Sequence, residues 1–182
     1  MRRIVSAMHI SLNGVVESAD QWVFPHGYSN DEMLQAIGSA MAAADTMLLG
    51  RVTYQGFAAH WPQQTGDIAD YMNNTPKLVV STTLDTVEWQ NSTLISGNPV
   101  KELAERKQQP GRNINVVGSA TLVRSLLREG LLDELQLLVC PILVGSGAHL
   151  FEDGGADVPL QLVDAKMFST GVQSLTYTPA GR

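Results

Sequence analysis

The chain has 182 residues, a net charge of −6 and 44% hydrophobic residues, which is ordinary for one globular domain with a substantial core. Its 12 lysines and arginines are spread along the chain, whereas nucleic-acid binding by phosphate neutralisation needs clustered positive charge. Cys140 is the single cysteine, which excludes an intrachain disulfide and a cysteine-based metal site within one chain. We therefore expect one domain over 1–182, a cytoplasmic location, a small-molecule ligand, no nucleic-acid partner and no metal.

Membrane and secretion signals are not evident. Polar residues interrupt the apolar stretch at the N-terminus, unlike the continuous apolar region of a signal peptide. The longest apolar stretches fall well short of the ~20 residues that a membrane-spanning helix needs. We expect no membrane partner.

The first half of the chain alternates predicted strands with predicted helices. Ser29 and Glu32 have the capping-box spacing ahead of an amphipathic helix, and Asn13-Gly14 is a turn signal. The predicted elements are a strand over 3–12, a loop over 16–28, a helix over 30–44, a strand over 46–50, a helix over 52–58, a loop over 60–67, and strands over 77–84 and 92–96.

The second half continues this alternation and closes with two adjacent strands. Asn98-Pro99 supplies an N-cap and first helical residue, and Ser119 and Gly130 are expected to cap the two ends of the following helix. The predicted elements are a helix over 99–107, a strand over 113–118, a helix over 120–129, a strand over 134–140 and a hairpin formed by 160–168 and 172–178. The alternation predicts an α/β fold with a mixed, mostly parallel sheet and a C-terminal antiparallel hairpin.

Two strand-to-helix junctions have the composition of anion sites. Gly50, Arg51 and Thr53 follow one buried strand, and Gly118 to Thr121 follow another. Ligands of open α/β sheets bind at the carboxyl ends of parallel strands, where helix N-termini offer free N–H groups. Two such junctions suggest a dinucleotide, although each has a simpler interpretation: Arg51 in an ion pair with a surface carboxylate, and Ser119 as a plain helix cap.

Four segments in this order resemble the dihydrofolate-reductase-like fold: LLGRVTYQGF (48–57), KLVVSTTL (77–84), INVVGSATLVRSLL (114–127) and DELQLLVCPILVGSGAHLF (133–151). In particular, they are similar to the reductase domain of the bifunctional riboflavin-biosynthesis protein RibD, its C-terminal domain. The resemblance extends over nearly the whole chain, and its most specific piece is 133–151.

This resemblance implies a reduced nicotinamide cofactor, NADPH in most relatives. Ala7 would then face the nicotinamide, and Ser81 and Thr82 would border the adenosine ribose. The phosphates would be held by Gly50, Arg51, Thr53, Gly118, Ser119, Ala120 and Thr121. Many relatives carry a basic residue at the position of Thr82, where it would pair with a 2′-phosphate, so NADH is not excluded.

The expected substrate region departs from the family pattern. Relatives often have Ser-Leu-Asp-Gly where this chain has Asn13 in place of the aspartate. Trp22 resembles the tryptophan of dihydrofolate reductases, but His26 and Gly27 follow Pro25, where those enzymes place the acid that binds the pterin. We therefore expect a substrate other than folate, with Asn13 and Trp22 as substrate-binding candidates; an alternative for Trp22 and Phe24 is a place in the core, favoured for Phe24.

Catalytic residues are hard to name, because the cofactor supplies the hydride. Asp20, His26 and Asp31 are candidates for a proton relay, with a solvated surface position as the alternative for each. His9, His60 and His149 lack metal-ligand spacing. Residues 144–149 contain Gly-x-Gly but no third fingerprint glycine, so we expect a tight turn rather than a dinucleotide-binding loop. The His-x-Glu and Pro-Cys-x-x-Cys patterns of the zinc deaminases are absent from the sequence.

The sequence thus predicts an NAD(P)H-dependent reductase of a C=N or C=O bond in a small heterocyclic or sugar-like substrate, similar to 5-amino-6-(5-phosphoribosylamino)uracil reductase. The alternative is a catalytically silent, dimeric ligand-binding protein that retains the fold. We also expect a homodimer, from the resemblance and because the apolar run 133–145 would be an aggregation hazard at an open sheet edge.

Overall fold

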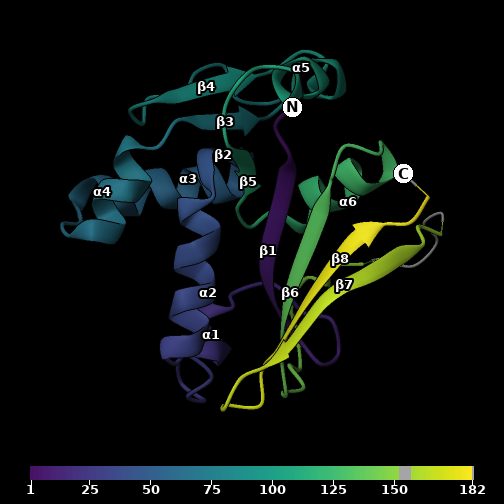
Figure 1. Ribbon diagram of the computed structural model, residues 1–182. Coiled ribbons are helices and arrows are strands. Elements are labelled where there is room, and N and C mark those ends of the chain that lie inside the picture. The colour runs from purple at the N-terminus through teal and green to yellow at the C-terminus, as the bar shows by residue number, and fades with distance from the viewer. Residues whose placement is uncertain (152–156, 182) are drawn as a thin grey trace.

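The computed structural model describes residues 1–151 and 157–181. Within them, eight strands form one sheet (Figure 1): β1 (Ile4–Ser11), β2 (Ala44–Gly50), β3 (Lys77–Val80), β4 (Ser92–Ile95), β5 (Asn113–Val116), β6 (Glu134–Cys140), β7 (Leu160–Met167) and β8 (Gln173–Pro179). Their order is β4-β3-β2-β5-β1-β6-β8-β7. Strands β1 to β6 pair in parallel, whereas β8 is antiparallel to β6 and β7. The predicted fold class, including the C-terminal hairpin, is confirmed.

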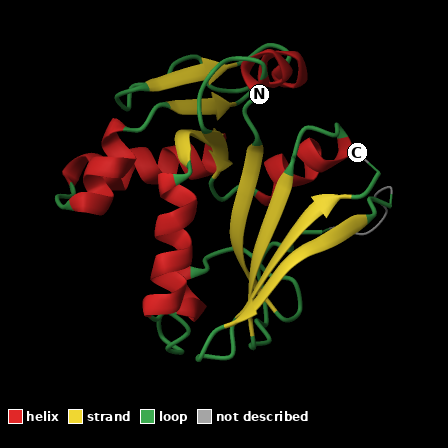
Figure 2. Ribbon diagram, in the orientation of Figure 1, coloured by secondary structure: helices red, strands yellow, loops and turns green. Residues whose placement is uncertain are grey.

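Helices cover both faces of the sheet (Figure 2). On one face, α5 (Pro99–Lys107) and α6 (Ala120–Arg128) pack on the even-numbered residues of β1 and β2. On the other, α2 (Asp31–Ala42) packs near β6, while α3 (Arg51–His60) and α4 (Asp67–Asn74) pack on β2 and β3. Two short helices complete the described chain, α1 (Asp20–Val23) and the 3-10 helix η1 (Trp61–Gln63).

Two of the predicted helix caps are confirmed. The Asn98 side chain accepts a hydrogen bond from the N–H of Lys101 at the start of α5. Gly130 follows α6 with a φ of 67°, and the next residue, Leu131, donates its N–H to the carbonyl of Leu126. This pattern ends a helix in a left-handed residue, a conformation that glycine adopts without steric cost.

The predicted cap of α2 is wrong by one residue. Asn30, not Ser29, is the N-cap, and its side chain accepts from the N–H of Met33. The Glu32 carboxylate does not close a capping box; it accepts from the N–H and the hydroxyl of Ser169. Glu32 therefore ties α2 to the turn between β7 and β8, a long-range contact that the local pattern does not contain.

Several predicted boundaries also differ. Strand β3 ends at Val80 rather than at Leu84, because the Ser81 hydroxyl accepts the N–H groups of Thr83 and Leu84 and turns the chain. Helix α1 lies in the predicted loop over 16–28, and α4 lies where no helix was predicted. Both are short, so their few buried residues, such as Ala69 and Met72 in α4, leave only a weak periodic pattern.

The sheet-edge argument for a homodimer is also wrong. Strand β6, in the middle of the apolar run 133–145, is not an edge strand, because β1 and β8 pair with its two sides. The edge on that side of the sheet is β7. Residues 145–147 bend, and the segment packs on the loop after β1: Leu150 N–H bonds to the Gly14 carbonyl, and Val15 pairs with His149 in an isolated β-bridge.

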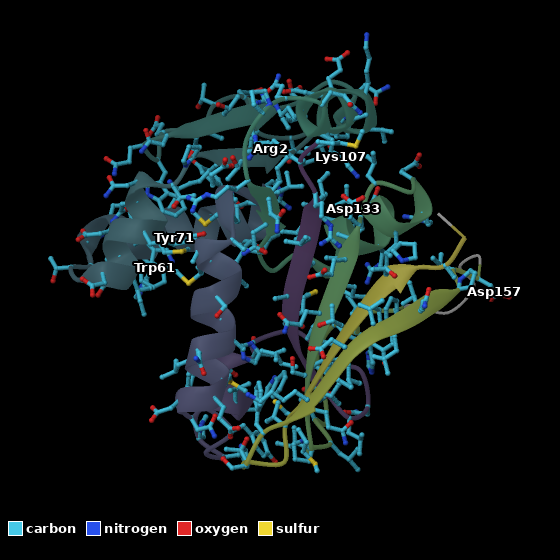
Figure 3. The ribbon with its side chains drawn as sticks, in the orientation of Figure 1. Arg2, Trp61, Tyr71, Lys107, Asp133 and Asp157 are labelled. Carbon is cyan, nitrogen blue, oxygen red and sulfur yellow. The ribbon has the colours of Figure 1, made fainter. Side chains whose placement is uncertain are left out.

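Paired charges fill the edge of the sheet where the parallel strands begin. Arg2, before β1, forms an ion pair with Asp45 of β2 and donates to the hydroxyl of Thr46 at 2.7 Å. The Lys107 ammonium lies 2.6 Å from the carboxylate of Asp133, which also accepts the N–H of Ile4. Figure 3 shows Arg2, Lys107 and Asp133 near this end of β1. We call this edge the amino edge.

Candidate functional site

At the opposite edge, the carboxyl edge, three neighbouring strands end in the segments that the sequence singled out. Strand β2 lies between β3 and β5 and ends at Gly50, next to Ser81 after β3 and Gly118 after β5. Because the three strands are parallel, both predicted anion junctions lie at one edge of the sheet. The structure therefore brings the two junctions together.

The two junctions interlock through their glycines. A Cβ atom on Gly50 would lie 2.4 Å from the Ser119 hydroxyl oxygen, and one on Gly118 would lie 2.9 Å from the Thr53 hydroxyl oxygen. Gly118 also has a φ of +63°, which disfavours other residues. The resemblance implies that Gly50 borders a phosphate; in the structure, the Ser119 side chain lies directly against Gly50.

Two helix N-termini begin where the two junctions meet, a place that we call the joint. Helix α3 begins after Gly50 and α6 begins after Ser119, and neither start has a side-chain cap or an acidic residue in its first turn. The Ser119 backbone is left-handed, with a φ of 51°, and its hydroxyl lies against Gly50, so Ser119 does not cap α6 as predicted. The first N–H groups of both helices are thus left without a capping side chain, and they carry a positive dipole end.

Arg51 adds a cation to this joint. Its side chain is exposed, and its guanidinium donates to the Gln55 amide oxygen at 3.0 Å. Across the described residues it has no ion pair, so the interpretation of Arg51 as a partner of a surface carboxylate is not supported. Arg51 is the first residue of α3, and a guanidinium near a helix N-terminus provides donors and charge that a phosphate group can bind.

The other predicted cofactor residues differ in how available their polar atoms are. Ser81 is buried and its hydroxyl already serves the turn after β3, whereas Thr82 is exposed. The Thr121 hydroxyl accepts from the guanidinium of Arg124 at 3.2 Å. Thr82 thus has its side chain open toward solvent, and Ala120 is the small first residue of α6.

A second feature is a partly open stretch on the sheet face that α2 covers. On the central strand β1, Ala7 and His9 are partly exposed although their neighbours are buried. Gln136 of β6 lies opposite Ala7 in the sheet and is also partly exposed; its amide donates to the Ser174 hydroxyl at 2.9 Å. Side chains of these residues share one face, because strand residues two apart point the same way.

His9 and Asn115 are the chemically distinctive residues of this face, and sequence reasoning missed both. The His9 Nε2 atom lies 3.4 Å from the sulfur of Met33 in α2, and burial lowers the pKa of His9, so the ring is neutral at pH 7. The Asn115 amide oxygen is buried without a described hydrogen-bond partner. Because His9 follows Ala7 by two residues in the same predicted strand, strand periodicity could have placed it on the same face as Ala7.

The predicted substrate and catalytic residues are either engaged within the protein or exposed. Asn13 binds the backbone of Val144 through both ends of its amide. Trp22 is 5% exposed and its indole N–H bonds to the Glu17 carbonyl, whereas Phe24, predicted for the core, is 63% exposed. Asp20, His26 and Asp31 are exposed. Their assigned roles stay predictions, but the polar atoms of Asn13 and most of the Trp22 ring are occupied within the protein.

Comparison with known sequences identifies one family. The model of the family described as RibD C-terminal domain matches residues 2–174. The uncharacterized protein YyaP of Bacillus subtilis (strain 168) is 26% identical over 185 aligned residues, covering 97% of this chain and 94% of that protein. Within the described residues, no helix is long and apolar enough to cross a membrane.

Comparison with solved structures supports the same fold. A putative riboflavin biosynthesis protein from Shewanella sp. PV-4 superposes with a TM-score of 0.80 at 18% identity, covering 98% of this chain and 99% of that one. Dihydrofolate reductase from Enterococcus faecalis, in complex with NADP(H) and RAB-propyl, superposes with a TM-score of 0.66 at 14% identity, covering 98% and 97%. At these identities the likeness shows the fold.

Proposed function

The chain belongs to the RibD C-terminal domain family, and we propose that it is a cytoplasmic NADPH-dependent reductase of a C=N or C=O bond in a small heterocyclic or sugar-like substrate. The observation that carries the proposal is the joint at the carboxyl edge, where two uncapped helix N-termini meet beside Arg51, which has no ion pair among the described residues. The family's riboflavin-pathway reductases and dihydrofolate reductase have the same fold.

The residues at the joint fit a nicotinamide dinucleotide. The N–H groups at the starts of α3 and α6 would hold its diphosphate, with Thr53 and the small residues Gly118 to Ala120 bordering it. Arg51 would pair with the 2′-phosphate of NADPH, and Thr82 and Ser81 would border the ribose. Ala7 leaves room for a flat ring on the open sheet face. When bound, the cofactor supplies the hydride.

The substrate face is uncharged at neutral pH. Ala7, Gln136 and neutral His9 share it, and none of them carries the carboxylate that would bind a pterin. We propose an uncharged polar substrate that hydrogen-bonds to an amide and an imidazole, with His9 as a proton-relay candidate better placed than Asp20, His26 or Asp31. Asn13 and Trp22 are then parts of the wall that supports this face.

The alternative is a ligand-binding protein without turnover. The missing carboxylates at positions 13 and 27 and the uncharged face favour it, because proton delivery to the substrate would rest on His9 alone. Binding of a reduced cofactor without its oxidation across a panel of carbonyl and imine substrates would identify this alternative.

The test is calorimetric titration of the protein with NADPH and, separately, NADH. We expect saturable binding that is tighter for NADPH. Arg51→Ala should weaken NADPH binding by at least about tenfold, as expected for a lost charge-assisted hydrogen bond, and should affect NADH less. Thr53→Ala should weaken both. Arg128→Ala, which removes an exposed arginine at the far end of α6, is the control and should change neither affinity.

Two results would reject the proposal. Equal affinities of Arg51→Ala and the unchanged protein for NADPH would remove Arg51 from the site. No binding of either cofactor would mean that the fold serves another ligand, and the assignments at the carboxyl edge would then be withdrawn.

A further inference from the structure

Asn115 is a polar side chain that lies among apolar neighbours near the middle of the sheet. It belongs to β5, and its register partners are Val5 of β1 and Met47 of β2. Both partners are buried, and neither side chain can donate a hydrogen bond. Asn115 itself is only 8% exposed, and its oxygen Oδ1 is buried without a hydrogen-bond partner among the described residues. Such an unsatisfied group is rare in folded proteins and lowers stability.

Asn115 shares its sheet face with the partly open stretch on β1. Val5 lies opposite Asn115 and precedes Ala7 and His9 by two and four residues, so these side chains point to the same face. Ala7 and His9 are partly exposed. Asn115 therefore lies beside the open stretch, two residues farther from the carboxyl edge than Ala7.

The helix that covers this face, α2, is also incompletely packed. Met33 in its first turn is buried, but the residues that follow Met33 at helical spacing are only partly buried: Ala36, Ile37, Ala40 and Met41. The sheet face and the inner side of α2 thus both leave apolar surface uncovered. A mostly apolar surface with a few well-placed polar groups is typical of a small-molecule site.

The surroundings of Asn115 favour a neutral ligand group. The Val5, Ala7 and Met47 side chains carry no charge, and the His9 ring is neutral at pH 7 because burial lowers its pKa. A charged ligand group would lose its hydration here without gaining an opposite charge. The primary amide of Asn115 has an acceptor oxygen and two N–H donors, so its complement is a neutral group with an N–H beside a carbonyl.

The spacing along the sheet suits a ligand of one ring. The proposed function places the nicotinamide ring at Ala7, and hydride transfer requires the substrate to lie close to that ring. Two residues along a strand span about 7 Å. A six-membered ring that contacts the nicotinamide can therefore reach Asn115 with a ring substituent.

We propose that Asn115 is a specificity-determining residue of the substrate site and that the substrate is a flat, neutral heterocycle with a lactam edge, a ring N–H next to a ring carbonyl. The N–H of the substrate donates to Asn115 Oδ1, and its carbonyl accepts from the Asn115 amide nitrogen. The inference rests on the proposed function, because it uses the position of the nicotinamide at Ala7. It adds the chemical class of the substrate and the residue that selects it.

The test is titration of the protein with 2-pyridone, a flat and uncharged lactam, with and without saturating NADPH. Binding is followed by the side-chain amide signals of Asn115 in NMR spectra, which are identified by their absence from Asn115→Leu. We expect saturable binding at millimolar concentration. N-methyl-2-pyridone, which lacks the N–H donor, should bind at least about tenfold more weakly, and Asn115→Leu should weaken 2-pyridone binding by a similar factor.

Stability separates a ligand-binding amide from a structural one. Asn115→Leu replaces an unsatisfied amide by an apolar group of similar shape and should raise the melting temperature by about 2–4 °C. Asn115→Thr, which is smaller and keeps a hydroxyl, should be at least as stable as the unchanged protein and retain part of the 2-pyridone binding.

Asn73 provides the matched control, because its side chain donates to the Trp61 carbonyl and accepts from the Trp89 indole N–H. Asn73→Leu should lower the melting temperature and leave 2-pyridone binding unchanged.

Three results would overturn the inference: a lower melting temperature for both Asn115 variants, equal binding of the two pyridones, or binding of NADPH without any binding of 2-pyridone. The third result would leave the proposed reductase function intact. Binding of 2-pyridone that depends on Asn115, without binding of NADPH or NADH, would support the lactam site and reject the proposed function instead.

Discussion

The two ends of the parallel strands carry polar groups in opposite states. At the amino edge, Arg2 is paired with Asp45 and Lys107 with Asp133. At the carboxyl edge, Arg51 has no ion pair among the described residues, and α3 and α6 start without side-chain caps.

This difference between the two edges indicates that the amino edge serves stability and the carboxyl edge serves binding. A polar group whose hydrogen bonds are all made within the protein contributes to folding and has nothing left to offer a ligand. A donor that stays unpaired at a rigid joint is available to one. Changes at the amino edge should therefore alter unfolding without altering cofactor affinity, and changes of exposed groups at the carboxyl edge should do the reverse.

The largest effect is expected for Asp133→Ala. The change removes the partner of the Lys107 ammonium and the acceptor for the N–H of Ile4, leaving a mostly buried charge unpaired. We expect the free energy of unfolding in urea to fall by about 3 kcal/mol. NADPH affinity of the folded protein should stay unchanged; a large loss of affinity would contradict the separation of the two edges. Asp133→Asn, which keeps a hydrogen-bond acceptor, should lower the free energy of unfolding less than Asp133→Ala does.

A somewhat smaller effect is expected for Lys77→Met at the start of β3. The buried Lys77 ammonium donates to the carbonyls of Asn73, Thr75 and Gln90 and lies 4.2 Å from the centre of the Trp89 ring. Leaving these acceptors without a donor should cost about 2 kcal/mol at pH 7.

Lys77 should also make stability depend on pH. Burial lowers the pKa of Lys77 from 10.5 to about 8, so between these values the unfolded chain keeps a proton that the folded chain has released. The contribution of this group to stability therefore rises from pH 8 to pH 10.5. Unfolding in urea of the unchanged protein and of Lys77→Met, each at pH 7.5 and 9.5, measures this effect. The free energy of unfolding of the unchanged protein should rise relative to that of Lys77→Met between the two pH values, and a constant difference would contradict the prediction.

The joint at the carboxyl edge is tested by Gly50→Ala. The added methyl group meets the Ser119 side chain, so we expect a loss of about 1–2 kcal/mol in unfolding free energy together with weaker NADPH binding. Adding Ser119→Ala should recover part of both. Gly56→Ala, where a Cβ atom meets nothing within 4 Å, is the matched control. Equal behaviour of the two glycine variants would show that the joint is not tight.

The smallest effect concerns Asp45. Burial alone would raise the pKa of this carboxyl, but hydrogen bonds from Arg112 N–H and the Thr46 hydroxyl, with the charges of Arg2 and Arg112, hold its pKa below the usual range. The stability that it contributes is present above the pKa of the unfolded chain and is lost as the pH falls through the folded one. Between pH 6 and pH 3, the free energy of unfolding of the unchanged protein should fall by up to about 1 kcal/mol more than that of Asp45→Asn, measured by thermal unfolding. An equal loss would mean that Asp45 is not paired in solution.

The sequence by itself determined most of the local elements. Helical spacing, Asn98 ahead of Pro99, and Gly130 after α6 are signals within a few residues of one another, and they predicted α5 and α6 correctly. The glycines at the ends of β2 and β5 indicated where the backbone needs room. Weak or short patterns, such as α1 and α4, were missed because few of their residues face the core.

Only the tertiary structure decided which residues are neighbours across the sheet. Strand order placed Ser119 against Gly50, gave β6 partners on both sides and left β7 at the edge. It also placed Gln136 beside Ala7 and Met33 beside His9. It paired the charges at one edge and left Arg51 at the other edge without an ion pair to any described residue. The fold brings Gly50 and Ser119 into contact although they are far apart in the chain, and the periodicity of a single segment carries no information about such partners.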